Sequence, residues 1–374
     1  MTSSAALEVL LDGLSPSQLA GQLLVVGFEG LALPAELASA LRAGERAGVV
    51  LFRRNLTPGH AGLNELRELC AEIGRAGAEE LPALIAIDEE GGRVARLSPP
   101  ALRLPPMRKL ADLGDLELIE RVGRAVGREL RCLGVTLNFA PVVDVDTNPD
   151  NPIIGDRAFS SHPERVVERA GAYMAGLRAG GLQNCLKHFP GHGDTLLDSH
   201  LALPTVGHPR ERLDRVELLP FRQLASLADS MMTAHVLYPA LDRRHPATLS
   251  RAIADELLRG ELGFDGVLFS DDLEMQAITG QGSMEESAIS ALRAGCDLLL
   301  VCSRADAQAR VHEALTRTLT ADSGFRQRCL QAARRGLELR QRCPPRPGSS
   351  AELASLLDSE VRPLEAELAV RLGA

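Results

Sequence analysis

Eight short apolar runs recur along the chain, and this recurrence constrains its fold more than any other feature. Most of them are rich in Val, Ile and Leu at consecutive positions, which is typical of strands buried on both faces of a parallel sheet. The runs lie at residues 23–27, 48–52, 83–88, 135–140, 185–189, 230–235, 266–271 and 297–302. A chain of 374 residues is long enough to bury such a sheet.

Segments with amphipathic helical character separate these runs, for example at 116–133, 164–179, 211–227, 251–262 and 305–319. Glycine commonly ends a helix, and it follows several such segments, at Gly134, Gly180, Gly263 and Gly295. Eight alternations of strand and helix predict an α/β fold of the (β/α)8 TIM-barrel type. An open doubly wound sheet is the main alternative. It usually has fewer strands and a glycine-rich nucleotide loop, and neither Gly-x-Gly-x-x-Gly nor a P-loop occurs here.

The barrel pattern ends shortly before residue 322. We therefore expect a catalytic barrel over residues 1–322 and a C-terminal helical extension over 323–374, packed on the barrel as part of one domain. Within the extension, the pattern predicts a helix at 325–342, a break rich in Pro, Gly and Ser at 344–350, and a terminal helix at 351–372.

The net charge of the chain argues against one class of binding partner. The chain carries a formal charge of −9, which argues against nucleic acid, because phosphate binding needs a basic field. The apolar stretch at 23–28 is too short to span a bilayer, and no Lys or Arg precedes Arg42, so no secretion signal is expected. These features predict a cytoplasmic protein without a membrane partner. No heptad or broad apolar stripe is evident, so we expect a monomer.

Cysteine usage also favours a reducing compartment. The chain has seven cysteines, an odd number, at wide spacing and without a Cys-x-x-Cys pair. A chain of this size needs no disulfide framework, so we expect free thiols. The cysteines are Cys70, Cys132, Cys185, Cys296, Cys302, Cys329 and Cys343.

Charged residues cluster where the predicted strands end, which is where barrel enzymes place their active sites. Asp-Glu-Glu-Gly-Gly-Arg follows the third run from Asp88, and Asp144 and Asp146 follow the fourth. We interpret Asp144 and Asp146 as turn formers or as partners of Arg157. The seventh run ends in Ser-Asp-Asp, at Asp271. Packing requirements alone do not explain this clustering of charge.

Several of these residues also have a purely structural interpretation. Asp271 or Asp272 would serve equally as the cap of a following helix. Asp88 would serve as an ion-pair partner at the barrel rim. His235, at the end of the sixth run, is interpreted as a hydrogen-bonded rim residue rather than as a catalyst.

The loop after the fifth run has the densest chemistry, with three histidines, two aspartates and a lysine between residues 187 and 200. Zinc binding is an alternative, because His188 and His192 are four residues apart, as in a helical His-x-x-x-His site. Pro190, Gly191 and Gly193 disfavour a helix there, so the two rings need not share a face.

Cleavage of a glycosidic bond with retention needs a nucleophilic carboxylate and a group that first donates and then accepts a proton. Asp271, at a rigid strand end, has the right chemistry for the nucleophile. His200 is suited by its pKa range to the acid/base, and Asp198 could orient its ring. Residue types and spacing alone make this a hypothesis.

Three sequence blocks resemble glycoside hydrolase family 3, in particular its bacterial single-domain β-N-acetylhexosaminidases (β-N-acetylglucosaminidases) of peptidoglycan recycling. They are Ala-Ile-Asp-Glu-Glu-Gly-Gly-Arg-Val-Ala-Arg at 86–96, Lys-His-Phe-Pro-Gly-His-Gly-Asp at 187–194 with Asp-Ser-His at 198–200, and Phe-Ser-Asp-Asp-Leu-Glu-Met at 269–275. The resemblance covers roughly residues 15–320 and implies Asp271 as the nucleophile, His200 as the acid/base and Asp198 as its partner. The sugar-binding residues that it implies are Asp88, Arg96, Arg157, Lys187 and His188.

The resemblance further implies an enzyme without metal or cofactor. Its substrate would be N-acetylglucosamine β-1,4-linked to anhydro-N-acetylmuramic acid, with or without peptide. A β-glucosidase or β-xylosidase of the same family and an N-acetylglucosaminide phosphorylase remain alternatives. Attack by the substrate's own acetamido group, with Asp271 only orienting it, is an alternative mechanism.

Overall fold

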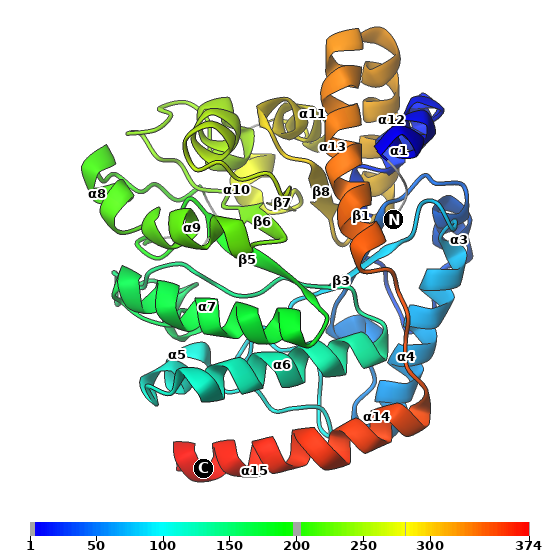
Figure 1. Cartoon of the computed structure of the whole chain (residues 1–374). Coiled ribbons are helices and arrows are strands. Elements are labelled where there is room, and N and C mark those ends of the chain that lie inside the picture. Colours follow the sequence, from blue (N-terminus) through cyan, green and yellow to red (C-terminus); the bar gives the residue numbers. More distant parts are fainter. Residues whose placement is uncertain (1–3, 197–202, 281, 374) are drawn as a thin grey trace.

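The chain folds into a closed barrel of eight parallel strands, in a computed structural model that describes residues 4–196, 203–280 and 282–373 (Figure 1). Each strand pairs with the next in sequence order, and β1 also pairs with β8, which closes the barrel. The predicted (β/α)8 fold is therefore confirmed, with a strand in each of the eight apolar runs. The strands are β1 Leu24–Val26, β2 Gly48–Leu51, β3 Leu84–Ile87, β4 Leu137–Asn138, β5 Gln183–Phe189, β6 Ser230–Thr233, β7 Val267–Asp272 and β8 Leu298–Val301.

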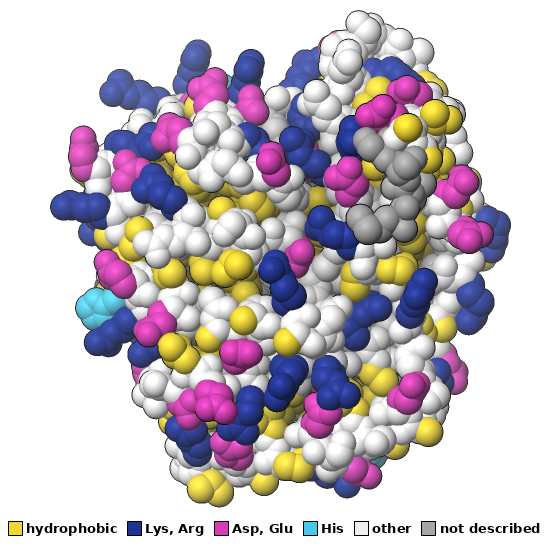
Figure 2. Space-filling view, in the orientation of Figure 1, with side chains coloured by type: hydrophobic (Ala, Val, Ile, Leu, Met, Phe, Trp, Pro, Cys, Tyr) yellow, Lys and Arg dark blue, Asp and Glu magenta, His cyan; other side chains and the backbone are white. Residues whose placement is uncertain are grey.

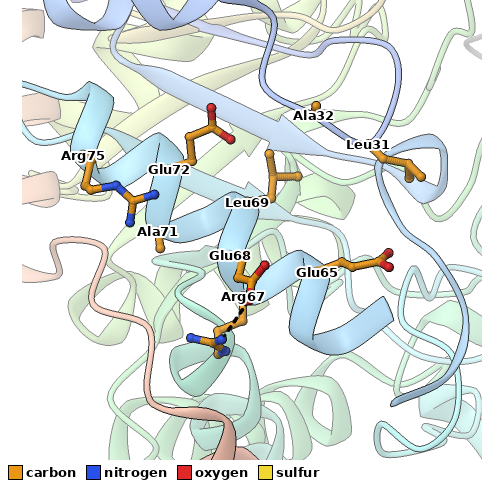
Figure 3. Close-up of a pocket in the computed structure, with 9 residues that line it drawn as sticks. All are labelled: Leu31, Ala32, Glu65, Arg67, Glu68, Leu69, Ala71, Glu72 and Arg75. Atoms are coloured by element: carbon orange, nitrogen blue, oxygen red, sulfur yellow. Dashed lines mark hydrogen bonds and ion pairs between the residues drawn. The ribbon is translucent and has the colours of Figure 1, made fainter. Parts of the chain in front are cut away.

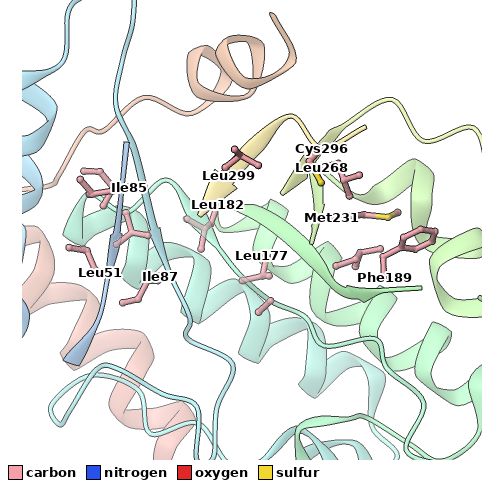
Figure 4. Close-up of a cluster of buried hydrophobic side chains, with 14 of the residues drawn as sticks. Leu51, Ile85, Ile87, Leu177, Leu182, Phe189, Met231, Leu268, Cys296 and Leu299 are labelled. Carbon is pink, nitrogen blue, oxygen red and sulfur yellow. The ribbon is translucent and has the colours of Figure 1, made fainter. Parts of the chain in front are cut away.

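Both faces of the strands are buried, which explains why the runs are apolar at consecutive positions. One cluster fills the barrel, where the rings of Phe139 and Phe269 pack edge to face with centroids 5.2 Å apart. The alternate residues, such as Ile85 and Ile87 of β3, point outward to the helices and contribute to the larger cluster shown in Figure 4. The barrel is thus a packed core, and only its ends are available for polar chemistry.

Helices surround the barrel, and glycines set how closely two of them pack. The helices α6 (Leu116–Leu133) and α7 (Pro163–Ala179) cross with backbones in contact, since a Cβ on Gly176 would lie 2.1 Å from the carbonyl oxygen of Glu120. Asp115 caps the start of α6, and Gly134 ends it with a φ of 96°. The other helices of the barrel layer are α1 Ser4–Asp12, α2 Pro16–Gly21, α3 Ala35–Arg42, α4 Gly59–Ala76, α5 Met107–Asp112, α10 Gln276–Thr279, α11 Met284–Ala294 and α12 Ala305–Ala321.

The prediction of one helix over residues 211–227 is wrong. This segment forms α8 (Arg210–Arg215), α9 (Leu219–Leu224) and a 3-10 turn, η3 (Ala225–Leu227). Pro220 opens α9, and a proline disfavours helical geometry in the residue before it and removes a hydrogen-bond donor. The predicted helix at 251–262 is present as η5 (Ala252–Glu261), which has π-type hydrogen bonding.

The C-terminal helices cover two sides of the barrel. The helix α13 (Ser323–Arg342) lies across the amino-terminal end, where Leu339 joins the cluster inside the barrel. Arg340 is buried there and donates to the carbonyl oxygens of Ala47 and Pro82 and to Oε1 of Gln22. The last helices, α14 (Ser350–Leu356), η6 (Leu357–Val361) and α15 (Arg362–Leu372), run along α6 (Figure 1). The division of the domain at residue 322 remains a prediction.

The surface mixes both signs of charge, and Figure 2 shows Lys, Arg, Asp and Glu side chains interspersed over the face that it presents. All seven cysteines are free, as predicted, and burial raises the pKa of Cys70 to about 12. Within the described parts of the chain, no helix combines the length and apolar character that crossing a membrane requires.

Candidate active site

The carboxyl ends of β3, β5 and β7 bring the candidate catalytic and binding residues to one rim of the barrel. Asp88 directly follows β3, Lys187 and His188 lie near the end of β5, and Asp271 lies at the end of β7. The turn after β3 requires glycine at residue 91, because its φ is +107° and a Cβ would lie 2.5 Å from a backbone oxygen.

Lys187 is the centre of a buried charge network. Its Nζ lies 2.7 Å from Oδ1 of Asp88 and 2.5 Å from Oε1 of Glu90. Arg96 donates from Nη2 to Oδ2 of Asp88 over 3.1 Å. Burial alone would raise the pKa of Asp88, but the charges of Lys187 and Arg96 outweigh it and lower that pKa. Both carboxylates thus stay ionised and hold Lys187 as a cation.

Arg157 pairs with Glu90 rather than with the acids after β4. The two side chains form a bidentate pair with distances of 2.8 and 2.9 Å. The charges of Arg157 and Lys187 overcome the effect of burial and hold the pKa of Glu90 far below its ordinary value. The interpretation of Asp144 and Asp146 as partners of Arg157 is therefore wrong, and Asp146 instead pairs with Arg108 over 2.9 Å. A planar guanidinium satisfies both oxygens of one carboxylate, which is why Arg157 and Glu90 select each other.

Asp144 organises the end of β5. It is fully buried and accepts hydrogen bonds from Nδ1 of His188 over 2.7 Å and from the backbone N–H groups of His188 and His192 over 3.2 and 2.6 Å. Burial would raise the pKa of Asp144, but His188 and its hydrogen bonds lower it. Because a carboxylate only accepts, Nδ1 of His188 carries the proton of this bond, and the orientation of the ring is fixed.

The segment from His188 to His192 is not a helix, as its proline and glycines predict. The strand β5 continues to Phe189, and Gly191 has a φ of +131°. The two imidazole rings lie edge to face, with centroids 5.8 Å apart, and burial lowers the pKa of His192 to about 4. In the parts of the chain that the structure describes, no group of three or more His, Cys, Asp or Glu side chains is arranged to hold a metal ion.

Asp271 is a partly buried carboxylate whose surroundings keep it ionised. Burial raises its pKa, but His235, His188, the backbone N–H of Asp272 and Lys187 together lower it below the ordinary value. The hydrogen bond from Asp272 N–H to Oδ1 of Asp271 is 2.8 Å long. A partly buried carboxylate that remains anionic has the protonation state that a nucleophile requires.

The neighbouring Asp272 behaves differently, since burial raises its pKa to about 7. Its Oδ1 accepts from the N–H groups of Glu274 and Cys302 over 3.1 and 3.3 Å, so it ties the end of β7 to β8. The next helix, α10, has Met275 at its N-cap. Neither Asp271 nor Asp272 is therefore a helix cap, and that alternative is wrong.

His235 supports the strand end that carries Asp271. The ring is fully buried, with Nδ1 2.7 Å from the hydroxyl of Thr248 and Nε2 3.0 Å from the carbonyl oxygen of Asp272. The interpretation of His235 as a hydrogen-bonded rim residue is confirmed. Its contact with the peptide next to Asp271 makes it a positioning residue for that carboxylate.

Asp198 and His200 lie outside the described residues, within 197–202. The described chain on either side of this segment is joined by a hydrogen bond between a carboxylate oxygen of Asp194 and Nε2 of His208. The predicted roles of Asp198 and His200 therefore stay predictions.

Sequence reasoning noted Glu90 and Asp144 at the strand ends but missed their roles. Glu90 was part of the quoted block after the third run, but its neighbour Glu89 has the same residue type, and only the structure separates their roles. Glu89 accepts from the backbone N–H groups of Arg96 and Leu97, whereas Glu90 binds side-chain cations. Asp144 stands at the end of the fourth run, but its partner His188 is 44 residues away, so no local signal indicated their contact.

A pocket elsewhere on the molecule contains none of these residues. It lies between α4 and the loop after β1, and Figure 3 shows its mixed lining, with Arg67 paired to Glu68 over 3.4 Å. Its position on the outside of the helical layer separates it from the strand ends.

Comparison with known proteins agrees with this geometry. Residues 18–335 match the family described as "Glycosyl hydrolase family 3 N terminal domain". The chain is 44% identical over 287 residues to a β-hexosaminidase of Pseudomonas aeruginosa, a match that covers 76% of this chain and 84% of that protein.

Solved structures of similar proteins also include a member of this family of glycosidases. A family 3 β-N-acetylglucosaminidase from Paenibacillus superposes with a TM-score of 0.84 at 39% identity, over 93% of this chain and 69% of that chain. NagZ from Neisseria gonorrhoeae, in complex with N-trifluoroacetyl-D-glucosamine, gives a TM-score of 0.76 at 31% identity, over 94% and 98% of the two chains. Fold, site and relatives define a (β/α)8-barrel glycosidase. More specifically, the chain belongs to glycoside hydrolase family 3.

Proposed function

We propose that this glycosidase removes terminal, non-reducing β-linked N-acetylglucosamine with retention of configuration. The observation that carries the proposal is the ionised carboxylate of Asp271 on the same rim as the network of Asp88, Lys187 and Arg96. The β-hexosaminidase relatives support the choice of sugar, as does the neighbour crystallised with N-trifluoroacetyl-D-glucosamine.

The charged rim supplies groups that recognise sugar hydroxyls. In this proposal Asp88, Arg96, Arg157, Lys187 and His188 bind the terminal sugar. The ion pairs among the carboxylates and cations fix each side chain before substrate arrives, which reduces the entropy lost on binding. The ring of His188 is held through Nδ1, so its Nε2 is the nitrogen left to face the substrate.

The reaction proceeds in two displacements. An oxygen of Asp271 forms a bond to the anomeric carbon as the glycosidic bond breaks, and His200 gives its proton to the departing oxygen. Water then attacks the glycosyl–Asp271 ester, His200 takes the water proton, and Asp271 leaves as a carboxylate. Asp198 orients His200. The roles of Asp198 and His200 rest on the Asp-Ser-His block at 198–200.

We further propose muropeptide-like fragments as the substrate, with N-acetylglucosamine linked to anhydro-N-acetylmuramic acid. After giving its proton, His200 is left as a neutral imidazole, which would repel the carboxylates of such an acceptor less than the anion left by a carboxylic acid donor. A monomer acting in the cytoplasm, without metal or cofactor, completes the proposal.

Substitution of Asp271 tests the nucleophile. We expect Asp271→Ala to lower kcat by on the order of 10⁴-fold or more, because the covalent route is removed. Asp265→Ala is the matched control, since Asp265 is exposed just before the other end of the same strand. A fluorinated N-acetylglucosamine analogue should label the peptide that contains Asp271. A label on another residue, or substantial turnover by Asp271→Ala, would contradict the covalent mechanism.

Leaving groups and sugars test the remaining assignments. His200→Ala should lose less activity on aryl glycosides with good leaving groups, which need little protonation, than on poor ones. Equal losses would show that His200 has a structural role. Comparable rates on nitrophenyl glucoside or xyloside would refute the sugar assignment, and sugar 1-phosphate formed in phosphate buffer would favour the phosphorylase alternative.

A further inference from the structure

Five arginines line a second cavity, which lies at the amino-terminal end of the barrel, opposite the active site. The cavity has a volume of about 500 Å³ and lies where η5, the end of α11 and the first half of α13 meet. Its charged lining consists of Arg251, Arg259, Arg293, Arg328, Arg335, Asp255 and Asp322.

The innermost arginines share a single carboxylate. Asp297, fully buried before β8, accepts from Nη2 of Arg259 over 2.6 Å and from Nη2 of Arg328 over 3.0 Å, and Nη1 of Arg335 lies 3.4 Å away. Burial lowers the pKa of Arg259, and the positive charges of Arg335 and Arg328 oppose the stabilising effect of Asp297. Three guanidinium groups around one carboxylate leave an excess of positive charge.

Some hydrogen-bond donors of this cluster are unused. Nη1 of Arg328 is buried without a hydrogen-bond partner. Arg335 makes one long contact to Asp297, and its side chain is 29% exposed. The 20-residue helix α13 begins at this cavity, and its second and third residues, Gly324 and Phe325, line it. Asp322 caps this helix start and accepts from the N–H of Phe325, so the positive field of the cavity comes from the arginines.

Arg259 also donates to the carbonyl oxygens of Phe264 and Gly266, and Arg328 to those of Gly295 and Cys296. These bonds satisfy donors but leave the positive charge without a counter-ion. Arg293 is paired with Asp322 over 2.8 Å, so this outer arginine is neutralised. Where α6 packs on α15, by contrast, Arg121 forms a bidentate pair with Glu367. That helix contact shows that this chain can join two helices with balanced charge. Around Asp297, in contrast, three arginines share one carboxylate.

We propose that this cavity binds the phosphoryl group of a small metabolite. Guanidinium groups offer planar pairs of donors that match phosphate oxygens, and a phosphate dianion would neutralise the excess charge. The volume falls within the range of small-molecule sites and exceeds what a bare phosphate fills, so room remains for a sugar-sized group. The site lies outside the proposed glycosidase site, and its occupancy is measurable without turnover.

Equilibrium dialysis of the full chain with radiolabelled inorganic phosphate, and separately with labelled glucose 6-phosphate, tests the proposal. We expect saturable binding of at least one of them with a dissociation constant of about 1 mM or lower. Tighter binding of the sugar phosphate identifies a metabolite site, and equal affinity identifies a phosphate site. Saturating N-acetylglucosamine is included to occupy the catalytic site.

Arg335→Gln is the decisive variant, because the contact of Arg335 to Asp297 is long and its loss should disturb the fold little. We expect about tenfold weaker binding, as for loss of one charge-assisted interaction. Arg317→Gln is the matched control, since Arg317 is 70% exposed on α12 and pairs only locally with Glu313. The thermal midpoint of both variants checks folding. Absence of saturable binding, or equal binding by wild type and Arg335→Gln, would overturn the proposal.

Discussion

Two sites at opposite ends of the barrel, around Lys187 and around Arg340, bury positive charge in opposite ways. At the carboxyl end, Lys187 and Arg157 are each matched by carboxylates, and all partners stay ionised. At the amino-terminal end, Arg340 is 1% exposed and reaches only backbone carbonyls and Gln22. Both arrangements satisfy their donors, but the Lys187 network holds acids and cations at the proposed catalytic rim, whereas Arg340 is enclosed by the fold.

This difference follows from what each site does: the Arg340 site stabilises the fold, and the Lys187 site is proposed to bind substrate. A guanidinium bonded to carbonyl oxygens closes the end of the core and joins α13 to the loops before β2 and β3. A network of opposite charges costs desolvation energy and gives little net stability, yet breaking it is expensive. The carboxyl end therefore retains a costly arrangement whose benefit lies in recognition and chemistry.

Removing one charge from the carboxyl-end network should have the largest effect. Glu90→Gln leaves Arg157 and Lys187 short of a carboxylate in a buried site, and we expect a loss of about 3–5 kcal/mol in the free energy of unfolding. Urea denaturation measures it. Glu360→Gln is the control, because the Arg128–Glu360 pair is 50% and 31% exposed and should contribute at most about 1 kcal/mol. Equal losses in the free energy of unfolding would show that the buried network contributes no more stability than an exposed ion pair.

The amino-terminal end should respond in stability but not in chemistry. Arg340→Ala removes the donor to Pro82 and Gln22 and one of two donors to the carbonyl oxygen of Ala47, and we expect a loss of about 2–3 kcal/mol. Thermal denaturation measures this loss, while kcat and KM per folded molecule should remain near those of wild type. A change in KM would show that the two ends are coupled. It would contradict the expectation that Arg340 affects only stability.

A smaller effect is expected where His235 holds the backbone beside Asp271. His235→Ala removes the contact to the carbonyl oxygen of Asp272, and we expect kcat to fall about tenfold with little change in KM. His235→Gln retains a donor at a similar distance and should restore part of the rate. Loss of stability without a specific fall in kcat would show that His235 only supports the fold.

The smallest effect concerns a buried acid away from the charge network. Burial raises the pKa of Glu129, which accepts from the N–H of Leu102, to about 8. The folded state therefore retains a proton that the unfolded state loses above its ordinary pKa, so Glu129 costs stability increasingly as pH rises from about 5 to 8.

Glu129→Gln removes this titration. We expect the variant to match wild type near pH 5 and to be more stable by at least about 1 kcal/mol above pH 8, measured as the unfolding free energy against pH. Glu338→Gln, at an exposed position of α13, is the control and should show no such trend. A variant less stable than wild type at high pH would contradict the raised pKa.

Much of the fold was predictable because it depends on local pattern. Each apolar run became a strand, since burial on both faces demands apolar residues at consecutive positions. The helix at α6 matched its predicted bounds because Asp115 and Gly134 mark its ends. The helix predicted at 211–227 failed, because its amphipathic pattern continues through a proline that interrupts the backbone.

The sequence by itself determined an eight-stranded barrel with acids and cations at the strand ends, because strand order and strand ends follow from the runs. Only the tertiary structure decided which charges pair. Arg157 and Glu90 are 67 residues apart, His188 and Asp144 are 44 apart, and Arg340 lies 293 residues from Ala47. Such pairs form because barrel closure brings distant strand ends together, and no local pattern records which neighbours they will meet.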